Sequence, residues 1–250
     1  MARNHGGPFA FVVAFRMARP YPCPMWQTLF GIVAVAVLAG LLARQFAAAR
    51  SRREAAPQAF FAEASAVLQT PAISAGETVG TYVMTGEYHG HAVQVKALID
   101  TLAVRKLPSL WLLVTIPEPL PVTAIFDLMM RPAGPATFSN FDRLPVTIER
   151  PPDFPEHAVV RTDDPVHLVP AHVVAPHLEP FFGHRAKELL ITPKGIRMVV
   201  LMAEGDRARY GVFRQAEFGE VTLERAMLTE ILERLLTLRA SIDNWHSSLA

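Results

Sequence analysis

An uninterrupted apolar segment near the N-terminus constrains this chain more than any other feature. Leu29 to Ala43 carries no polar side chain, and Met25 to Thr28 extends the run to 19 residues. A helix of that length is about 28 Å long, close to the ~30 Å hydrocarbon thickness of a bilayer. Trp26 falls where an interfacial aromatic residue belongs, and Arg44 can extend toward the headgroups at the other end. The segment predicts a transmembrane helix with a short extension over residues 25–49.

A cleaved signal peptide is the rival interpretation, because Ala47–Ala49 resembles a small-residue cleavage site. Positive charge directly after an apolar run resists translocation, and Arg44 is followed by three arginines within residues 50–53. Within about 20 residues, Arg16 and Arg19 precede the segment and these four arginines follow it. The positive-inside rule therefore favours a single-pass anchor with a cytoplasmic domain, by a margin of two charges.

The charge balance changes after Arg53. The first 53 residues hold seven arginines and no acidic residue, which leaves 17 basic and 23 acidic residues for the rest. A mildly acidic body lacks the basic surface that phosphate binding needs, so we expect no nucleic acid partner. We expect the lipid bilayer as partner of the basic head. Arginine outnumbers lysine twenty to four, which is typical of GC-rich bacterial coding, so the expected location is a bacterial inner membrane.

The first 24 residues contain one short apolar stretch, Phe9 to Phe15, which is too short to span a bilayer. We expect residues 1–24 to be disordered or to belong to a misannotated start, with Met17 and Met25 as alternative starts. Cys23 is the only cysteine, so no intrachain disulfide can form.

Behind the anchor, residues 50–75 are predicted to form a hinge and a short helix, and residues 76–250 one domain. The short helix covers Pro57 to Gln69 and stops at Thr70-Pro71. Strand patterns follow, with turn residues at Tyr88–Gly90 and Thr192–Gly195 that predict two hairpins. The predicted strands are Thr78–Glu87, His91–Val104, Ser109–Ile116, Val122–Met130, Val146–Glu149, Ala158–Arg161, Lys187–Thr192, Gly195–Met202 and Ala208–Gln215.

Two helices complete the predicted domain. Val169 to Phe182 reads as a helix that prolines start or interrupt. The last helix runs from Glu220 to Asn244 and carries an apolar stripe at alternating spacings of three and four. The stripe consists of Leu228, Ile231, Leu235, Leu238 and Ile242. It either packs on the domain's own sheet or forms an intermolecular coiled coil. Meanders with flanking helices predict an α+β fold with an antiparallel sheet.

Two groups of residues that contain histidines are the candidates for a metal-binding or acid/base site. His89 and His91 share a strand face and could begin a metal site, although the same spacing fits a hairpin turn. The second group comprises Asp163, Asp164, His167, His172, His177 and His184. On a helix His172 and His177 would point about 140° apart, so they would not converge. The candidate metal ligands are therefore His89, His91, Asp164, His167, His177 and His184.

Established catalytic motifs are missing from the sequence. It contains no G-x-x-x-x-G-K-[ST], no strand-linked G-x-G-x-x-G, no G-x-S-x-G and no H-E-x-x-H. We therefore assign no catalytic residue and expect no cofactor.

Three segments spread over about 100 residues form a pattern. They are VGTYVMTGEYHGHAVQV (Val79–Val95), FDRLPVTIERPP (Phe141–Pro152) and LVPAHVVAPHL (Leu168–Leu178). Together they resemble uncharacterised bacterial single-pass membrane-anchored proteins with an α+β soluble domain. Those proteins join a small-residue hairpin to an F-D-x-x-F-like strand and a helix that begins near a proline. Here Leu144-Pro145 replaces the second aromatic residue. The resemblance implies no activity.

We therefore expect a non-enzymatic, membrane-tethered binding or scaffolding protein whose ligand and protein partner the sequence does not identify. One alternative is a metal-dependent or acid/base hydrolase-like enzyme that uses the 163–184 cluster. The other is a module that self-associates through the helix from Glu220 to Asn244.

Overall fold

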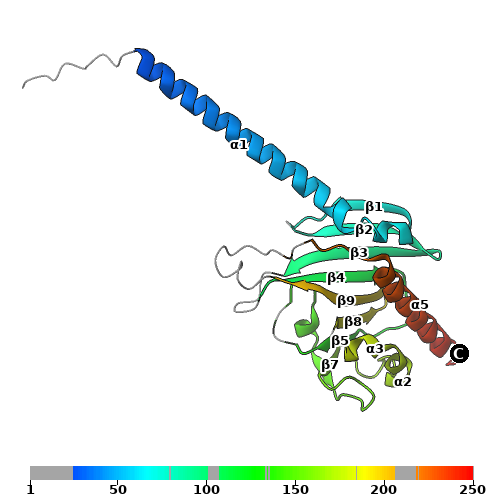
Figure 1. The fold of residues 1–250 in the computed structure, drawn as a ribbon. Coiled ribbons are helices and arrows are strands. Elements are labelled where there is room, and N and C mark those ends of the chain that lie inside the picture. The colour runs from blue at the N-terminus through cyan, green and yellow to red at the C-terminus, as the bar shows by residue number, and fades with distance from the viewer. Residues whose placement is uncertain are drawn as a thin grey trace, which may run out of the picture. The chain divides into compact units, whose positions relative to one another are not determined.

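The computed structural model describes residues 25–249, except 79, 101–106, 133, 135, 184, 206–217 and 219. The chain divides into two compact units, Met1–Arg50 and Ser51–Ala250. Helix α1 (Met25–Phe60) begins in the first unit and ends in the second (Figure 1).

The first unit is described by its helix alone. Within α1, Leu29–Ala48 is 20 residues long, apolar and entirely exposed, and is by length and composition able to cross a membrane. A signal sequence near an N-terminus would meet the same criterion. The predicted apolar helix is confirmed, and it continues beyond residue 49 to Phe60.

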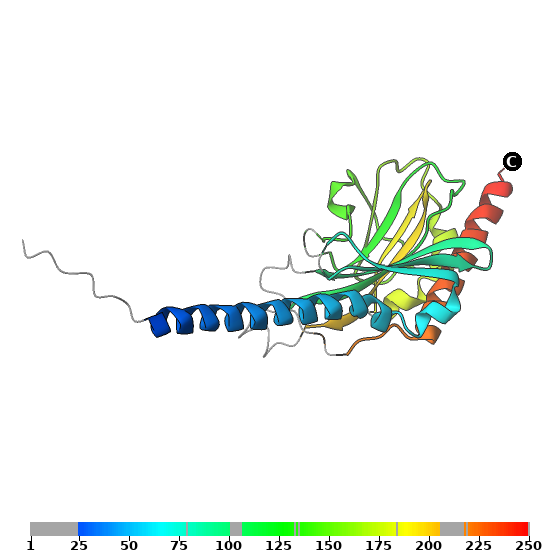
Figure 2. The same ribbon diagram turned by 90° about the horizontal axis from the view of Figure 1, so that it is seen from above.

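The second unit is built on an antiparallel sheet with nine strands in the described residues. Their order is β1-β2-β3-β4-β9-β8-β5-β7-β6, so β4 lies beside β9 although some 80 residues separate them in sequence (Figures 1 and 2). The strands are β1 Gln69–Ala75, β2 Tyr82–Tyr88, β3 His91–Asp100, β4 Ser109–Ile116, β5 Phe126–Met130, β6 Val146–Ile148, β7 Ala158–Thr162, β8 Ala186–Thr192 and β9 Gly195–Glu204. The predicted α+β class with an antiparallel sheet and flanking helices is confirmed.

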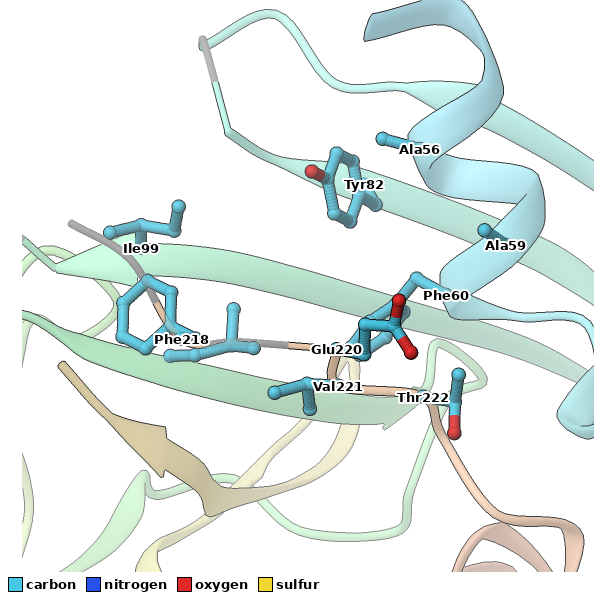
Figure 3. Close-up of a pocket in the computed structure, with 10 residues that line it drawn as sticks. Ala56, Ala59, Phe60, Tyr82, Ile99, Phe218, Glu220, Val221 and Thr222 are labelled. Atoms are coloured by element: carbon cyan, nitrogen blue, oxygen red, sulfur yellow. The ribbon is translucent and has the colours of Figure 1, made fainter. Parts of the chain in front are cut away.

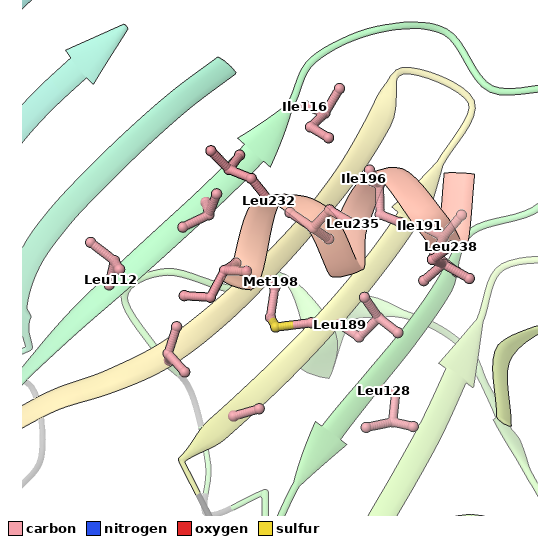
Figure 4. Packing of buried hydrophobic residues seen from close by; sticks show 14 of the residues in the cluster. Leu112, Ile116, Leu128, Leu189, Ile191, Ile196, Met198, Leu232, Leu235 and Leu238 are labelled. Carbon is pink, nitrogen blue, oxygen red and sulfur yellow. The ribbon is translucent and has the colours of Figure 1, made fainter. Parts of the chain in front are cut away.

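One face of this sheet is apolar and is covered by helix α5 (Arg225–Ser247). Leu232, Leu235 and Leu238 of α5 point onto Met198 and Leu189 of the sheet (Figure 4). All five residues of the predicted apolar stripe are buried in this core. Self-association through this helix would have to use its outer side and stays a prediction.

The opposite face of the sheet has a smaller apolar cluster under residues 136–143, which include a 3₁₀ turn at Phe141–Arg143. Phe138 and Phe141 are buried there against Leu113 and Val199. Trp111 packs on Phe138 with 5.1 Å between ring centroids.

Both predicted hairpins are confirmed. His89 and Gly90 connect β2 to β3 with φ angles of 51° and 82°, the left-handed conformations of a two-residue turn. Pro193 and Lys194 connect β8 to β9. The short strands predicted near residues 146 and 158 are confirmed as β6 and β7.

Residues 50–75 differ from the prediction of a hinge and a short helix. Helix α1 passes through Pro57 to Phe60, a 3₁₀ turn follows at Ala64–Val67, and Gln69–Ala75 is edge strand β1. Pro71 suggested a helix stop, but an edge strand tolerates proline, and the pairing of β1 with β2 shifts register between Gln69 and Ala72.

The helix predicted over residues 169–182, which prolines were expected to start or interrupt, is not continuous. The chain forms three short pieces instead: α2 (Ala171–Val174), a 3₁₀ turn (Ala175–His177) and α3 (Glu179–Phe182). Pro176 and Pro180 each start a new piece, because proline fits a first helical turn and removes the hydrogen bond that would continue the preceding one.

Two elements begin later than expected. The strand predicted from Val122 begins only at Phe126. The last helix begins at Arg225 rather than Glu220. Strand β3 is described to Asp100. The strand predicted over 208–215 and the disorder predicted over 1–24 lie outside the described residues.

Candidate functional site

A cavity of about 620 Å³ opens at one end of the apolar face of the sheet (Figure 3). Three parts of the second unit surround it: the last turns of α1, the ends of β2, β3 and β4, and the segment that leads into α5. The lining residues are Ala56, Ala59, Phe60, Tyr82, Ile99, Leu110, Phe218, Glu220, Val221 and Thr222.

Specific contacts hold these parts together. The Leu223 N–H donates to the Phe60 carbonyl oxygen at 2.9 Å, which ties the segment before α5 to the end of α1. The Phe60 ring lies 5.8 Å from the Tyr82 ring. Gly80 has φ +80°, and a Cβ there would lie 2.9 Å from Ile99 Cδ1. Glycine therefore gives the turn its conformation and leaves room for Ile99 in the wall.

The lining of the cavity is mostly apolar. Of the lining residues, Phe60 and Leu110 are buried, and Phe218 and Val221 are half-buried. Glu220 is exposed and supplies the one carboxylate of the described lining. That lining contains no histidine, cysteine, lysine or arginine. A cavity of this size and composition is in the range of small-molecule sites and suits an apolar group.

A second cavity, of about 400 Å³, lies along the same segment and shares Glu220, Val221 and Thr222 with the first. It is more polar, because Arg185 and Glu224 also line it. The segment Glu220–Thr222 thus borders an apolar cavity and a polar one.

The first predicted histidine pair fixes the tip of the β2–β3 hairpin. His91 Nδ1 lies 2.7 Å from Glu118 Oε2, and the Ala92 N–H donates to Glu118 Oε1 at 2.7 Å. His89 Nε2 lies 3.4 Å from Glu233 Oε1 of α5. The two histidines therefore contact different carboxylates.

The Tyr88 hydroxyl donates to the same Glu233 oxygen at 2.5 Å. This hydrogen bond, with burial and the charge of Glu233, raises the pKa of Tyr88 to about 12. The phenol therefore remains a donor throughout the neutral range and supports a structural role for the hairpin tip.

The second predicted group is spread over the domain. Asp164 Oδ2 lies 2.7 Å from His167 Nδ1 in an exposed turn, and this hydrogen bond lowers the pKa of Asp164, as does the Val166 N–H. His177 Nε2 lies 3.0 Å from Ser241 Oγ of α5, and burial lowers the pKa of His177. His184 lies outside the described residues.

Within the described part of the chain, no three His, Cys, Asp or Glu residues form a group suited to a metal ion. The described candidates His89, His91, Asp164, His167 and His177 each have a local partner instead. The metal or acid/base enzyme stays a prediction, which elemental analysis of the purified protein for stoichiometric zinc or manganese would test.

Sequence reasoning missed a buried charged cluster on the other face of the sheet. Asp127 of β5 is 2% exposed and Glu188 of β8 fully buried. Arg197 of β9 donates from Nη2 to Glu188 Oε2 at 2.8 Å. Burial and the charge of Glu188 raise the pKa of Asp127 to about 8, against the opposing charge of Arg197. Burial likewise raises the pKa of Glu188, although Arg197 and Ser139 oppose it.

A sequence signal for this cluster existed. Asp127 and Glu188 each interrupt a short apolar strand, FDLMM in β5 and AKELLIT in β8. A charge inside such a run marks a buried ionisable group rather than a solvated one. The cavity residues had no comparable signal, because they come from separated segments.

No protein-family model and no curated protein sequence match this chain. Among solved structures, it is similar to the mycobacterial trehalose monomycolate transport factor A, TtfA, with 10% sequence identity and a TM-score of 0.35. The similarity covers 68% of this chain and 78% of TtfA. At that level neither fold detail nor function transfers from TtfA to this chain.

Proposed function

We propose that this chain is a membrane-tethered binding protein, held in a bacterial inner membrane by residues 25–49 and presenting its sheet domain to the cytoplasm. The observation that carries the proposal is the Leu29–Ala48 segment, which has no protein cover within the described residues. A helix that exposes Leu, Ile, Val and Phe on all sides is unfavourable in water and favourable in hydrocarbon. The cavity lined in part by the end of α1 supplies a place for a ligand, and its described lining holds no assembled catalytic group.

Membrane extraction tests the tether. The full-length protein should stay in the membrane pellet after an alkaline carbonate wash, with an intact mass that retains residues 25–49. Two arginines at the helix centre, in Val35→Arg/Leu38→Arg, cost about 5–7 kcal/mol of insertion free energy and should release the protein.

A matched control places the same charges elsewhere. Val166 and Leu249 are exposed hydrophobic residues outside the apolar segment. Val166→Arg/Leu249→Arg should leave the protein in the membrane fraction. Wild-type protein in the soluble fraction, or a mass that begins after Ala47–Ala49, would contradict the tether and favour a cleaved signal peptide.

Partner binding and sidedness need separate measurements. A protein partner should copurify with the full-length chain in several detergents, and a strictly lone chain in all of them would contradict scaffolding. For sidedness, Ser247→Cys in a Cys23→Ser background places a thiol on an exposed position. An impermeant maleimide should label it only after spheroplasts are lysed if the domain is cytoplasmic. Labelling of intact spheroplasts would place the domain outside.

A further inference from the structure

We propose that the cavity at the end of α1 binds a lipid acyl chain taken from the bilayer that holds the protein. This inference rests on the proposed tether and adds the chemical class of the ligand. It concerns the part of the cavity lined by Phe60, Tyr82, Leu110 and Phe218.

The composition of the lining favours a hydrocarbon ligand. Seven of the ten described lining residues are Ala, Phe, Ile, Leu or Val, and they come from α1, β3, β4 and the segment before α5. Tyr82, Glu220 and Thr222 are the polar side chains among the ten. Burying a methylene chain against such a surface is favourable in proportion to its area.

A peptide fits this lining less well than an acyl chain. Each residue of a buried peptide brings an N–H and a C=O that need hydrogen-bond partners, and an unpaired one is costly. The described lining offers few polar side chains to pair with them. An acyl chain brings no such group, so the chemistry of the wall favours it.

The chain itself keeps the cavity close to lipid. Ala56, the first lining residue, follows Ala48, the last residue of the apolar segment, by eight positions. In any conformation eight residues reach no further than about 29 Å. A tethered cavity therefore stays within about this distance of the headgroup layer. There the local concentration of lipid is high and does not depend on the solubility of lipid in water.

Glu220 and Thr222 define the polar end of the site. Both are exposed and also border the second, polar cavity. An amphiphile can place one acyl chain beside Phe60 and Leu110 while its headgroup stays in solvent at the exposed rim beside Thr222. The shared chemistry is the acyl chain, and a free fatty acid and a bilayer phospholipid are its two sources.

Photocrosslinking distinguishes these possibilities in the full-length protein. The protein is reconstituted in phosphatidylcholine vesicles that contain either diazirine-labelled palmitic acid or phosphatidylcholine with a diazirine acyl chain. After illumination, peptide mass spectrometry maps the adducts. We expect adducts on Leu29–Ala48, which faces lipid, and on the cavity residues Phe60, Tyr82 and Phe218. The arm with the stronger cavity labelling identifies the source of the chain.

A matched pair of variants tests the cavity itself. Ala59→Trp places an indole on a lining position of the last turns of α1, and should lower cavity labelling at least tenfold. Gln58→Trp makes the same addition one residue earlier, at an exposed position that is not part of the lining. It should leave cavity labelling within twofold of wild type. Both variants should keep the adducts on Leu29–Ala48.

The outcomes separate this inference from the tether. Adducts on Leu29–Ala48 with none in the cavity overturn the acyl-chain site and leave the tether standing. Equal cavity labelling in wild type and Ala59→Trp also overturns the site. Protein that carries no adduct on Leu29–Ala48 overturns the proposed function as well.

Discussion

Two neighbouring rows of residues cross the same sheet and differ in almost every side chain. The row on the face that packs against α5 runs from strand to strand through Ile73, Met84, Val95, Val114, Met198, Leu189, Leu128, Val160 and Ile148. The row one residue along, on the opposite face, runs through Ala72, Thr85, Gln94, Thr115, Arg197, Leu190, Asp127, Arg161 and Thr147. Because side chains alternate along a strand, one sheet carries two unlike surfaces.

The difference shows where each face obtains its stability. The apolar face buries mainly hydrocarbon side chains, in part under a helix. The opposite face buries charge under residues 136–143, where Arg161 lies 5.0 Å from the Phe141 ring centroid. Within the described residues, the buried side-chain polar atoms without a hydrogen-bond partner all lie on that face. They are Trp111 Nε1, Asp127 Oδ1, Arg161 Nε, Glu188 Oε1 and Arg197 Nε. The stability of the second face is therefore limited by hydrogen bonds that its buried polar atoms do not make, rather than by packing.

The largest expected effect comes from breaking the charged face. Arg197→Met removes the cation from Glu188, which is fully buried, and should cost about 3–5 kcal/mol of unfolding free energy. Urea unfolding of the full-length protein in a mild detergent measures it. The double variant Glu188→Gln/Arg197→Met removes both charges and should recover most of the loss. A single variant as stable as wild type would show that the ion pair does not support this face.

Truncation of the apolar face should cost somewhat less. Leu235 of α5 is fully buried against the sheet, so Leu235→Ala should lower the unfolding free energy by about 3 kcal/mol through lost burial and the cavity left behind. Leu236→Ala makes the same change at the next position, which is half-buried, and should cost about a third as much. Equal costs at the two positions would mean that α5 does not pack on the sheet through its Leu235 side.

The third effect depends on pH. The pKa of Asp127 is about 8, above its ordinary value, so between those values the folded state holds a proton that the unfolded state releases. Stability therefore falls as pH rises toward 8 and changes no further above it. Asp127→Asn cannot ionise and should gain about 2 kcal/mol over wild type between pH 6 and pH 8. Parallel stability curves for the two proteins over that range would contradict a protonated Asp127.

Local signals explain why part of the fold was predictable. Turn residues at His89-Gly90 and Pro193-Lys194 marked the hairpins, and spacing of three and four marked α5, because both patterns need only neighbouring residues. Edge strand β1 was missed because Pro71 also fits a helix stop, and whether a proline ends a helix or sits at a sheet edge depends on a distant partner strand.

The candidate site was less predictable than the fold. His89 and His91 were selected by spacing, but spacing does not reveal that Glu233 and Glu118 lie beside them, 144 and 27 residues further on. The cavity joins Phe60, Tyr82 and Phe218 across more than 150 residues. The order of strands decides such proximity, and the pairing of β4 with β9 has no local sequence mark.

The smallest expected effect concerns charge at the rim of the apolar face, in contrast to charge buried in the opposite face. Burial raises the pKa of Glu118, but the hydrogen bonds from His91 and the Ala92 N–H and the charge of Arg239 outweigh it, so the net shift is downward. Because the pKa of Glu118 is lowered, its ionised carboxylate stabilises the fold at pH values above the ordinary pKa of 4.5. This contribution is lost as pH falls through the pKa of the folded state.

Glu118→Gln should therefore cost about 1 kcal/mol of unfolding free energy at pH 7 and progressively less below pH 4. Hydrogen exchange of the Ala92 amide in the full-length protein should accelerate in parallel, whereas exchange in β5 should not change. Faster exchange in β5 would mean that the rim and the buried charges form one coupled network, and the two faces could no longer be treated as independent.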